Sequence, residues 1–384
     1  YGDHRDLHLS IRRQRQMCIR DRLSIPDRSD TANIQPRAAS REEIFWKSER
    51  SRVQAKPSGL GDLDSITQAI NIMKKQRGFK LDGWIALDKP AQMTSTQALG
   101  AVKRILHPQK AGHAGTLDPL ATGCLPIALG EATKTIPYAQ DHIKTYRFTV
   151  RWGEARTTDD AEGDVTQTSD VRPDTAAIHA ILPRFTGAVV QIPPQFSALK
   201  IAGERAYDLA RAGQEIALPP RTVHIESLDL IEETQDKATF RAVCGKGTYM
   251  RALARDLAVA LGSVGHIADL RRESVGPFDA KTMISLDNLE KLVQSGRLGE
   301  ALRPVETVLD DIPALALNNG EAARLKSGKI LSFVARPDLE RLKTAGIDLR
   351  AEGGVMALAR CGDRPIALVS VRGPEIQPYR ILNV

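Results

Sequence analysis

The stretch that decides the fold runs from Gly112 to Lys134 and reads GHAGTLDPLATGCLPIALGEATK. Its first acid, Asp118, is surrounded by small and apolar residues, and Pro119 follows it directly. Proline fixes its own φ angle and disfavours a helical conformation of the residue before it. The glycines allow backbone conformations and close approaches that a Cβ would hinder. The stretch therefore predicts a rigid loop that presents one carboxylate among apolar neighbours.

An aspartate before proline is, by itself, more often a turn residue or a helix cap than a functional group. The length of the pattern favours function here, because some twenty consecutive residues closely resemble the active-site segment of the bacterial tRNA pseudouridine-55 synthases, the TruB family. In that family the acid of G-x-L-D-P-L-A-T-G is the catalytic aspartate, a role that the resemblance gives to Asp118. The similarity extends from about Gly78 to Leu309, and more weakly to the C-terminus.

Composition limits the class of protein. The chain has 384 residues, of which 42% are hydrophobic and 26% charged, enough for a core in two or three domains. It contains no apolar run of membrane-spanning length and no signal-peptide core at its start, so we expect a cytoplasmic protein without a membrane partner. The cysteines are far apart, without metal-site spacing, which indicates free thiols at positions 18, 124, 244 and 361.

The net charge of +7 fits an RNA partner without requiring one, because three of the seven charges lie in residues 1–72. That segment has no sustained periodicity, and we expect it to be a disordered or non-native extension. The alternative is a native basic arm that helps to hold RNA. Because the net charge does not decide whether the partner is RNA, that inference must come from motifs in the remaining residues.

Local patterns predict both strands and helices. Gly83–Pro90 should be a short strand that ends at proline, and Thr94 should cap a following helix. Residues 146–152 alternate apolar and polar side chains, as a strand with one buried face does. Further helices are expected over 174–187, 205–212 and 248–261, and further strands over 238–244, 355–360 and 365–372.

These elements lack βαβ regularity, which indicates an α+β fold with a largely antiparallel sheet flanked by helices. The resemblance makes this a pseudouridine-synthase-like catalytic domain over residues 73–309. It also implies a small β-rich, PUA-like RNA-binding domain over residues 310–384.

Two further residues are expected to act with Asp118. Arg251 follows Lys-Gly-Thr-Tyr-Met, which resembles the family motif K-G-T-Y-[IV]-R, whose arginine pairs with the catalytic aspartate. Taken alone, it would more often be a surface residue. Tyr146 lies in Lys-Thr-Tyr-Arg, which resembles the family's K-R-Y-R and implies that its ring stacks on a flipped uracil. Taken alone, it would more often be a core residue.

The resemblance supplies four substrate-pocket positions as well. Tyr249 and Leu270 match residues that surround the uridine, and His113 matches a histidine that occupies the space left by the flipped nucleotide. Lys89 lies in a D-K-P motif that supports the active-site loop. In contrast, the acidic run at 159–164 lacks the spacing of an EF-hand and is expected to be a solvated loop.

The function implied is isomerisation of the T-loop uridine of tRNA, position 55, to pseudouridine. No redox step or external group enters this reaction, so we expect no cofactor and no metal, and a monomer that binds the T-arm stem-loop. The sequence leaves the reaction route open. Two rivals are a non-catalytic RNA-binding module and a hydrolase, such as a glycosidase, with an aspartyl nucleophile. The hydrolase would need a second carboxylate, and only Glu131 offers one between His113 and Asp141.

Overall fold

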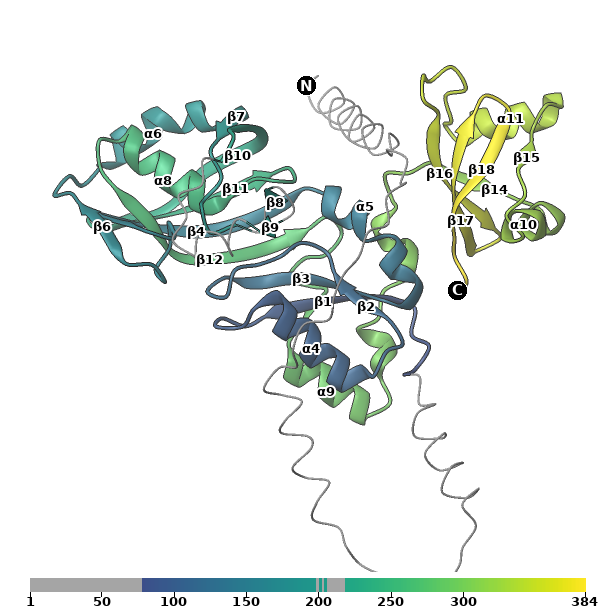
Figure 1. The fold of residues 1–384 in the computed structure, drawn as a ribbon, viewed down its shortest axis with the longest axis horizontal. Coiled ribbons are helices and arrows are strands. Elements are labelled where there is room, and N and C mark those ends of the chain that lie inside the picture. The colour runs from purple at the N-terminus through teal and green to yellow at the C-terminus, as the bar shows by residue number, and fades with distance from the viewer. Residues whose placement is uncertain (1–77, 198–199, 202–203, 206–217) are drawn as a thin grey trace, which may run out of the picture. The chain divides into compact units, whose positions relative to one another are not determined.

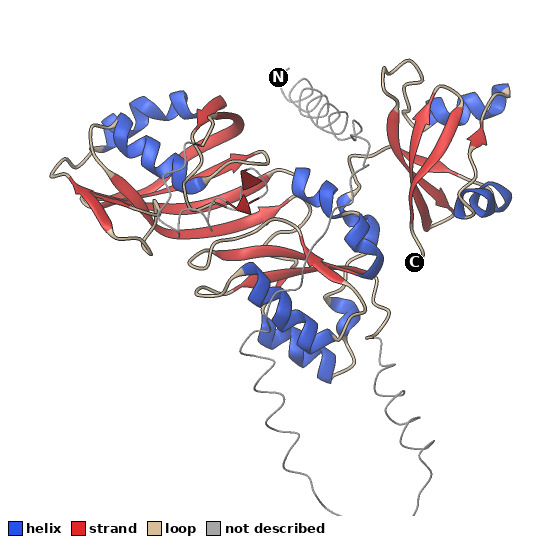
Figure 2. Ribbon diagram, viewed as in Figure 1, coloured by secondary structure: helices blue, strands red, loops and turns tan. Residues whose placement is uncertain are grey.

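The first part of the described structure is built on a sheet of nine strands (Figures 1 and 2). The computed structural model describes residues 78–197, 200–201, 204–205 and 218–384. The extension expected over 1–72 lies outside them, and so does the helix expected over 205–212 except for Arg205. In spatial order the strands are β13 (Met283–Ile284), β1 (Gly83–Lys89), β3 (Thr122–Leu129), β12 (Gly265–Val275), β4 (Lys144–Trp152), β11 (Lys237–Cys244), β10 (Arg221–Thr234) and β7 (Gly187–Gln191), with β2 (Ala111–His113) paired to β3.

Strand β12 joins two parts of this sheet that are distant in sequence. It pairs antiparallel with β4 along its whole length, and parallel with β3 only at Arg271–Thr122 and Arg272–Gly123. The other large pairings, β1 with β3 and β4 with β11, are antiparallel. The mixed, largely antiparallel sheet expected from the sequence is therefore confirmed.

The helices begin where local signals place them. Thr94 and Gln97 form a capping box at the start of α4 (Ser95–Leu106). Helix α8 (Met250–Ala260) packs against β12 and β4, and α4 packs against α9 (Leu286–Gln294). The helix expected over 174–187 is shorter, since α6 (Thr175–Ile181) gives way to the 3-10 turn η2 (Leu182–Phe185). Pro183 at the start of that turn cannot donate the hydrogen bond that an α-helix needs.

Short elements complete this part of the chain. They are α5 (Ile136–Asp141), η1 (Gly130–Lys134), η3 (Leu298–Glu300), η4 (Val305–Val308), the paired strands β5 (Glu154–Arg156) and β6 (Val165–Thr168), and the paired strands β8 (Lys200–Ile201) and β9 (Glu204–Arg205).

A second sheet has a core of its own. Its core includes Leu325, Leu342 and Val369, which are separate from the cluster around Phe148 and Phe240 in the first sheet. The strands are, in order, β14 (Ala314–Ala316), β16 (Val355–Cys361), β17 (Arg364–Arg372), β18 (Glu375–Ile381) and β15 (Leu331–Ser332), accompanied by α10 (Asn319–Lys326) and α11 (Arg336–Thr344). In the described residues, no helix is both long enough and apolar enough to cross a membrane.

Candidate active site

The Asp118 loop, between β2 and β3, is fixed by hydrogen bonds to its backbone. Ser95, the first residue of α4, accepts a hydrogen bond from the Leu117 N–H at 2.8 Å and donates one to the Leu117 carbonyl at 3.0 Å. The Ala121 N–H closes a turn on the Asp118 carbonyl at 3.1 Å. The side chain of Asp118 remains 34% exposed. The loop therefore holds the carboxylate rigidly and leaves it accessible.

Lys89, at the end of β1, supports the same loop through hydrogen bonds to backbone carbonyls. Its side chain is fully buried, and Nζ donates to the carbonyls of Met93 at 2.6 Å, Pro90 at 2.9 Å and Pro119 at 3.3 Å. Burial lowers the pKa of Lys89 to about 8, and the charge of Asp118 opposes that shift. The loop therefore encloses the ammonium of Lys89, in keeping with a supporting role, and the assignment of Lys89 to the substrate pocket stays a prediction.

Replacing Lys89 by methionine should lower the free energy of unfolding by about 2–4 kcal/mol, because three buried carbonyls lose a charged donor. The measurement is denaturant unfolding of the purified variant. The exposed Lys103 on α4 offers the matched control, since its replacement by methionine should change the stability by less than about 0.5 kcal/mol. Equal effects of the two changes would contradict the structural role of Lys89.

Arg251, in the first turn of α8, lies against Asp118. Its Nε lies 2.9 Å from Asp118 Oδ2, and its Nη2 donates to Oδ1 at 3.3 Å. The guanidinium also donates to the carbonyls of Thr158 and Phe196, at 2.9 and 2.8 Å, and only 6% of the side chain is exposed. Although 133 residues separate Asp118 and Arg251, the fold brings them into one ion pair.

Asp160 is a second carboxylate on the same guanidinium, and sequence reasoning missed it. Its Oδ2 lies 3.6 Å from Arg251 Nε, and its side chain is only 3% exposed. Its Oδ1 accepts a hydrogen bond from the Glu162 N–H at 3.0 Å and another from the Thr158 hydroxyl. The solvated loop expected at 159–164 is therefore wrong for Asp160, because α8 covers the turn and supplies a buried cation.

Glu162 also lies within the electrostatic reach of Asp118. Burial raises the pKa of Glu162, and the negative charges of Asp160 and Asp118 add to that effect. The sequence argument against a glycosidase, which rested on the lack of a second carboxylate near Asp118, is therefore wrong. The number of carboxylates near Asp118 therefore does not decide between isomerisation and hydrolysis.

Tyr146, on β4, lies in the same electrostatic neighbourhood. Burial raises the pKa of its phenol, while the positive charge of the Arg272 guanidinium acts in the opposite direction. The negative charge of Asp118 acts on the phenol as well. The structure thus brings Asp118 and Arg251 into contact and places Tyr146 within electrostatic reach of Asp118, and the roles of the three residues stay predictions.

The site geometry can be compared with known proteins. Residues 103–250 match the family described as TruB family pseudouridylate synthase (N terminal domain), and residues 251–310 match the tRNA pseudouridylate synthase B C-terminal domain. A tRNA pseudouridine synthase B from Bradyrhizobium diazoefficiens is 53% identical over 308 residues, which cover 79% of this chain and 86% of the relative. The chain belongs to the TruB family of pseudouridylate synthases.

A second relative agrees. The tRNA pseudouridine synthase B of Caulobacter vibrioides is 50% identical over 312 residues, which cover 81% of this chain and 99% of the relative. Among solved structures, a chain described as part of a Cbf5-Nop10-Gar1 complex has a TM-score of 0.59 at 24% identity, covering 78% of this chain and 84% of that one. That similarity concerns the fold alone. Since pseudouridylate synthases rearrange their substrate without adding or removing atoms, this TruB-family chain is an isomerase.

The other predicted pocket residues occupy three different surroundings. His113, on β2, is partly buried, and burial together with the charge of Arg272 lowers its pKa, which favours the neutral ring. Tyr249 precedes α8, and the Arg221 guanidinium lies 4.4 Å from the centre of its ring. Leu270, on β12, is buried in the core of the first sheet. Their roles toward a uridine stay predictions.

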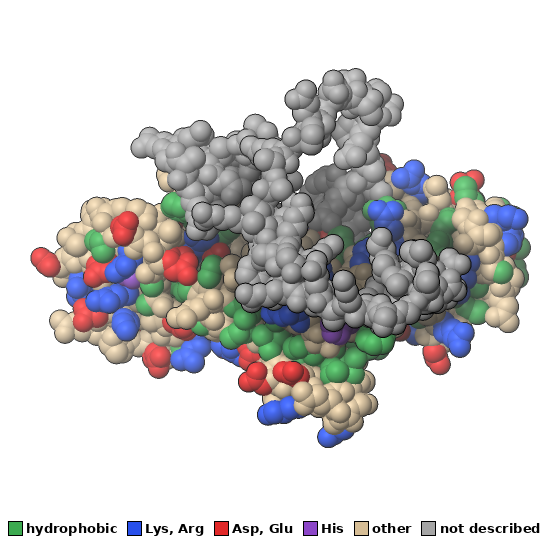
Figure 3. Space-filling view, turned by 60° about the horizontal axis from the view of Figure 1, so that its bottom comes forward, with side chains coloured by type: hydrophobic (Ala, Val, Ile, Leu, Met, Phe, Trp, Pro, Cys, Tyr) green, Lys and Arg blue, Asp and Glu red, His purple; other side chains and the backbone are tan. Residues whose placement is uncertain are grey.

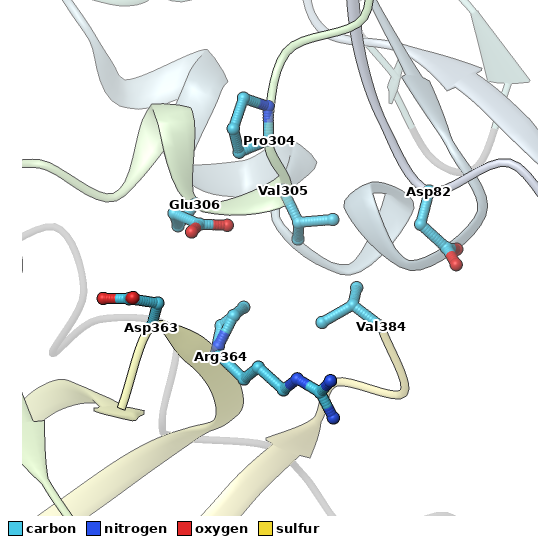
Figure 4. A pocket seen from close by; sticks show the side chains of 8 residues that line it. Asp82, Pro304, Val305, Glu306, Asp363, Arg364 and Val384 are labelled. Carbon is cyan, nitrogen blue, oxygen red and sulfur yellow. The ribbon is translucent and has the colours of Figure 1, made fainter. Parts of the chain in front are cut away.

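One cavity in the described structure is separate from this site. It has a volume of about 610 Å³ and is lined by Asp82, Pro304, Val305, Glu306, Asp363, Arg364, Pro365 and Val384 (Figure 4). None of the predicted site residues lines it, so this cavity is not the candidate active site.

One group in the described part of the chain has the spacing of a cation site. The candidate ligand atoms of His142, Asp310 and Asp311 lie within 4.8 Å of one another. The Nε2 atom of His142, however, already lies 3.0 Å from the Val308 carbonyl oxygen. None of these three residues belongs to the site around Asp118.

Proposed function

We propose that the protein converts a uridine of tRNA to pseudouridine, and that this uridine is position 55 in the T-loop. The observation that carries the proposal is the ion pair between the accessible carboxylate of Asp118 and the buried guanidinium of Arg251. The tRNA substrate is supported by the names of relatives that are 50–53% identical over most of this chain. The family also favours isomerisation over hydrolysis.

The reaction requires four changes in the substrate. The bond between ribose C1′ and uracil N1 breaks, the base turns, a bond forms between C1′ and C5, and the proton on C5 moves away. Asp118 is proposed as the catalytic carboxylate, acting on the sugar or on the base. Arg251 fixes the direction of that carboxylate and balances its charge, because it contacts both oxygens.

A uridine in a folded RNA loop must leave its stack before this chemistry can occur. We propose that the extruded uracil lies on the ring of Tyr146, on β4, which β12 separates from the strand that follows the Asp118 loop. Tyr249 and Leu270 would surround the same base, and His113 would occupy the space that the base leaves in the RNA. A planar ring suits this role because it stacks on uracil regardless of the neighbouring sequence.

Recognition of the tRNA should depend on shape more than on bulk charge. On the face shown in Figure 3, basic side chains are interspersed with acidic ones, so no single-sign field covers the visible surface. We propose that the T-arm is recognised through its phosphates and extruded bases, and that the second sheet, within residues 310–384, is a PUA-like RNA-binding domain. The working form would be a cytoplasmic monomer.

The test uses a full-length tRNA transcript labelled with tritium at uracil C5. Tritium release together with pseudouridine at position 55 is the expected result, and a transcript with cytidine at that position should release none. Binding of the transcript without release would favour an RNA-binding module. Free uracil as the product would favour the hydrolase.

Chelation gives an independent check of the chemistry. Pretreating the protein with excess EDTA and removing the chelate should leave the rate of tritium release unchanged, because the proposed steps require only the carboxylate and the base. Magnesium is then returned to the tRNA alone, so that the RNA keeps its fold. A rate that fell while the circular dichroism spectrum of the protein stayed the same would refute this account.

A further inference from the structure

Arg272, on β12, is a buried cation beneath the Asp118 loop. Only 2% of the residue is exposed. Its Nε donates to the Cys124 carbonyl at 2.7 Å and its Nη2 donates to the Gly115 carbonyl at 3.0 Å. Arg272 is also the register partner of Tyr146 where β12 pairs with β4, so the two side chains lie side by side on one face of the sheet. One side chain therefore connects strand β3 with the loop that carries Asp118, next to the ring proposed to hold the uracil.

The backbone around Arg272 is shaped to admit this side chain. Gly115 has a φ of +93°, and a Cβ there would lie 3.4 Å from Arg272 Nη1. Gly123 has a φ of +97°, and a Cβ there would overlap the Arg272 carbonyl. Both positions therefore favour glycine for their backbone conformation, and Gly123 requires it for space as well. The glycines of the G-H-A-G-T-L-D-P-L-A-T-G segment thus allow close contact between the loop and β12.

The charge of Arg272 is also unusual. In the part of the chain that the structure describes, its guanidinium has no carboxylate as an ion-pair partner, whereas its neighbour Arg271 has a bidentate one in Asp88, at 3.0 Å for both bonds. A buried cation without an acid is costly. The carbonyl groups of Cys124 and Gly115 are the acceptors that compensate for it here.

We propose that Arg272 is a positioning residue for isomerisation, which fixes the phenol oxygen of Tyr146 relative to the Asp118 loop and keeps a positive charge beside it. The inference rests on the proposed function, in which uracil stacks on Tyr146. Arg272 lies beside Tyr146 because the two residues are register partners across β12 and β4. The ring orientation and the loop position are then set by the same rigid fork.

The experiment is a double-mutant cycle measured by single-turnover tritium release with enzyme in excess. Arg272→Gln should slow release about 30- to 100-fold, with tRNA affinity within threefold of wild type. In a Tyr146→Phe background, which lacks the phenol oxygen, the same change should slow release by less than about threefold. Arg241→Gln is the control, because this arginine is exposed and lies on the opposite face of the sheet.

The cycle separates positioning from general structural support. Multiplicative losses in the double variant, or an Arg272→Gln rate within threefold of wild type, would overturn the proposal. Should Tyr146→Phe release no measurable tritium, Arg272→Lys decides, since it keeps the charge and loses the fork. If Arg272→Lys has a higher melting temperature than Arg272→Gln but releases tritium no faster, the result supports positioning. Any other combination of the two measurements refutes the proposal.

Failure of the proposed function has a different signature. In that case wild-type protein forms no pseudouridine in the same transcript. If wild-type protein is active and Asp118→Asn is inactive while Arg272→Gln is normal, only the inference about Arg272 is wrong.

Discussion

Replacing Asp118 by asparagine abolishes pseudouridine formation, by a factor of at least about 10⁴, and leaves tRNA affinity within a few-fold. The amide occupies nearly the same volume as the carboxylate but cannot act as a nucleophile or a base. The side chain of Asp118 is one-third exposed, so the replacement should change the free energy of unfolding by about 1 kcal/mol or less. Tritium release measures the activity, and filter binding of the labelled transcript measures the affinity.

A matched control exists on the same sheet. Asp269, on β12, is exposed, and its replacement by asparagine should leave the rate near that of wild type. Residual activity of the Asp118 variant within a hundredfold of wild type would show that another group performs the chemistry. Glu162 would then be the first residue to test, because its pKa is already raised by burial and by the two neighbouring aspartates.

Replacing Arg251 by glutamine should cost both activity and stability. The change leaves Asp118 and the buried Asp160 without their shared cation, and breaking a buried ion pair from one side destabilises a protein by about 3–5 kcal/mol. Turnover should fall about 10³-fold, because the Asp118 carboxylate loses the contacts that fix its direction. Tritium release and denaturant unfolding measure the two effects.

A second change separates them. Asp160→Asn in the Arg251→Gln background removes the buried charge that has lost its partner, so it should restore part of the stability and none of the activity. Arg255→Gln, one turn later on α8, removes a guanidinium that pairs with Asp159 and Asp256 instead, and should slow release far less. If the Arg251 variant kept the wild-type rate, the ion pair with Asp118 would have no part in the reaction.

The elements that the sequence predicts well are those whose causes are local. The cap at Thr94, the alternation through Phe148 and Val150, and the apolar face of α8 each depend on residues within a few positions of one another. The break at Pro183 is local as well, but the apolar pattern continues across it. The pattern alone therefore gives too long a helix.

The site is only partly predictable for the opposite reason. Asp118, Tyr146 and Arg251 were expected together because their motifs resemble those of one family, whereas nothing in the spacing of Asp160 or Arg272 indicates their partners. Arg272 contacts residues 148 and 157 positions earlier in the chain. The alternation of side chains along β12 does not reveal that this strand lies between β3 and β4. Asp160 gains the Arg251 guanidinium as a partner only when α8 packs nearby.

The late position of β12 in the sequence sets the order in which the protein can mature during synthesis. Strands β3 and β4 are complete once residue 152 has been made, yet the strand that fills the space between them ends only at Val275. Until then, two sheet edges are unprotected and open to wrong pairing. A nascent chain that ends before Val275 carries the carboxylate loop without the complete strand that lies beside it, so its site is incomplete.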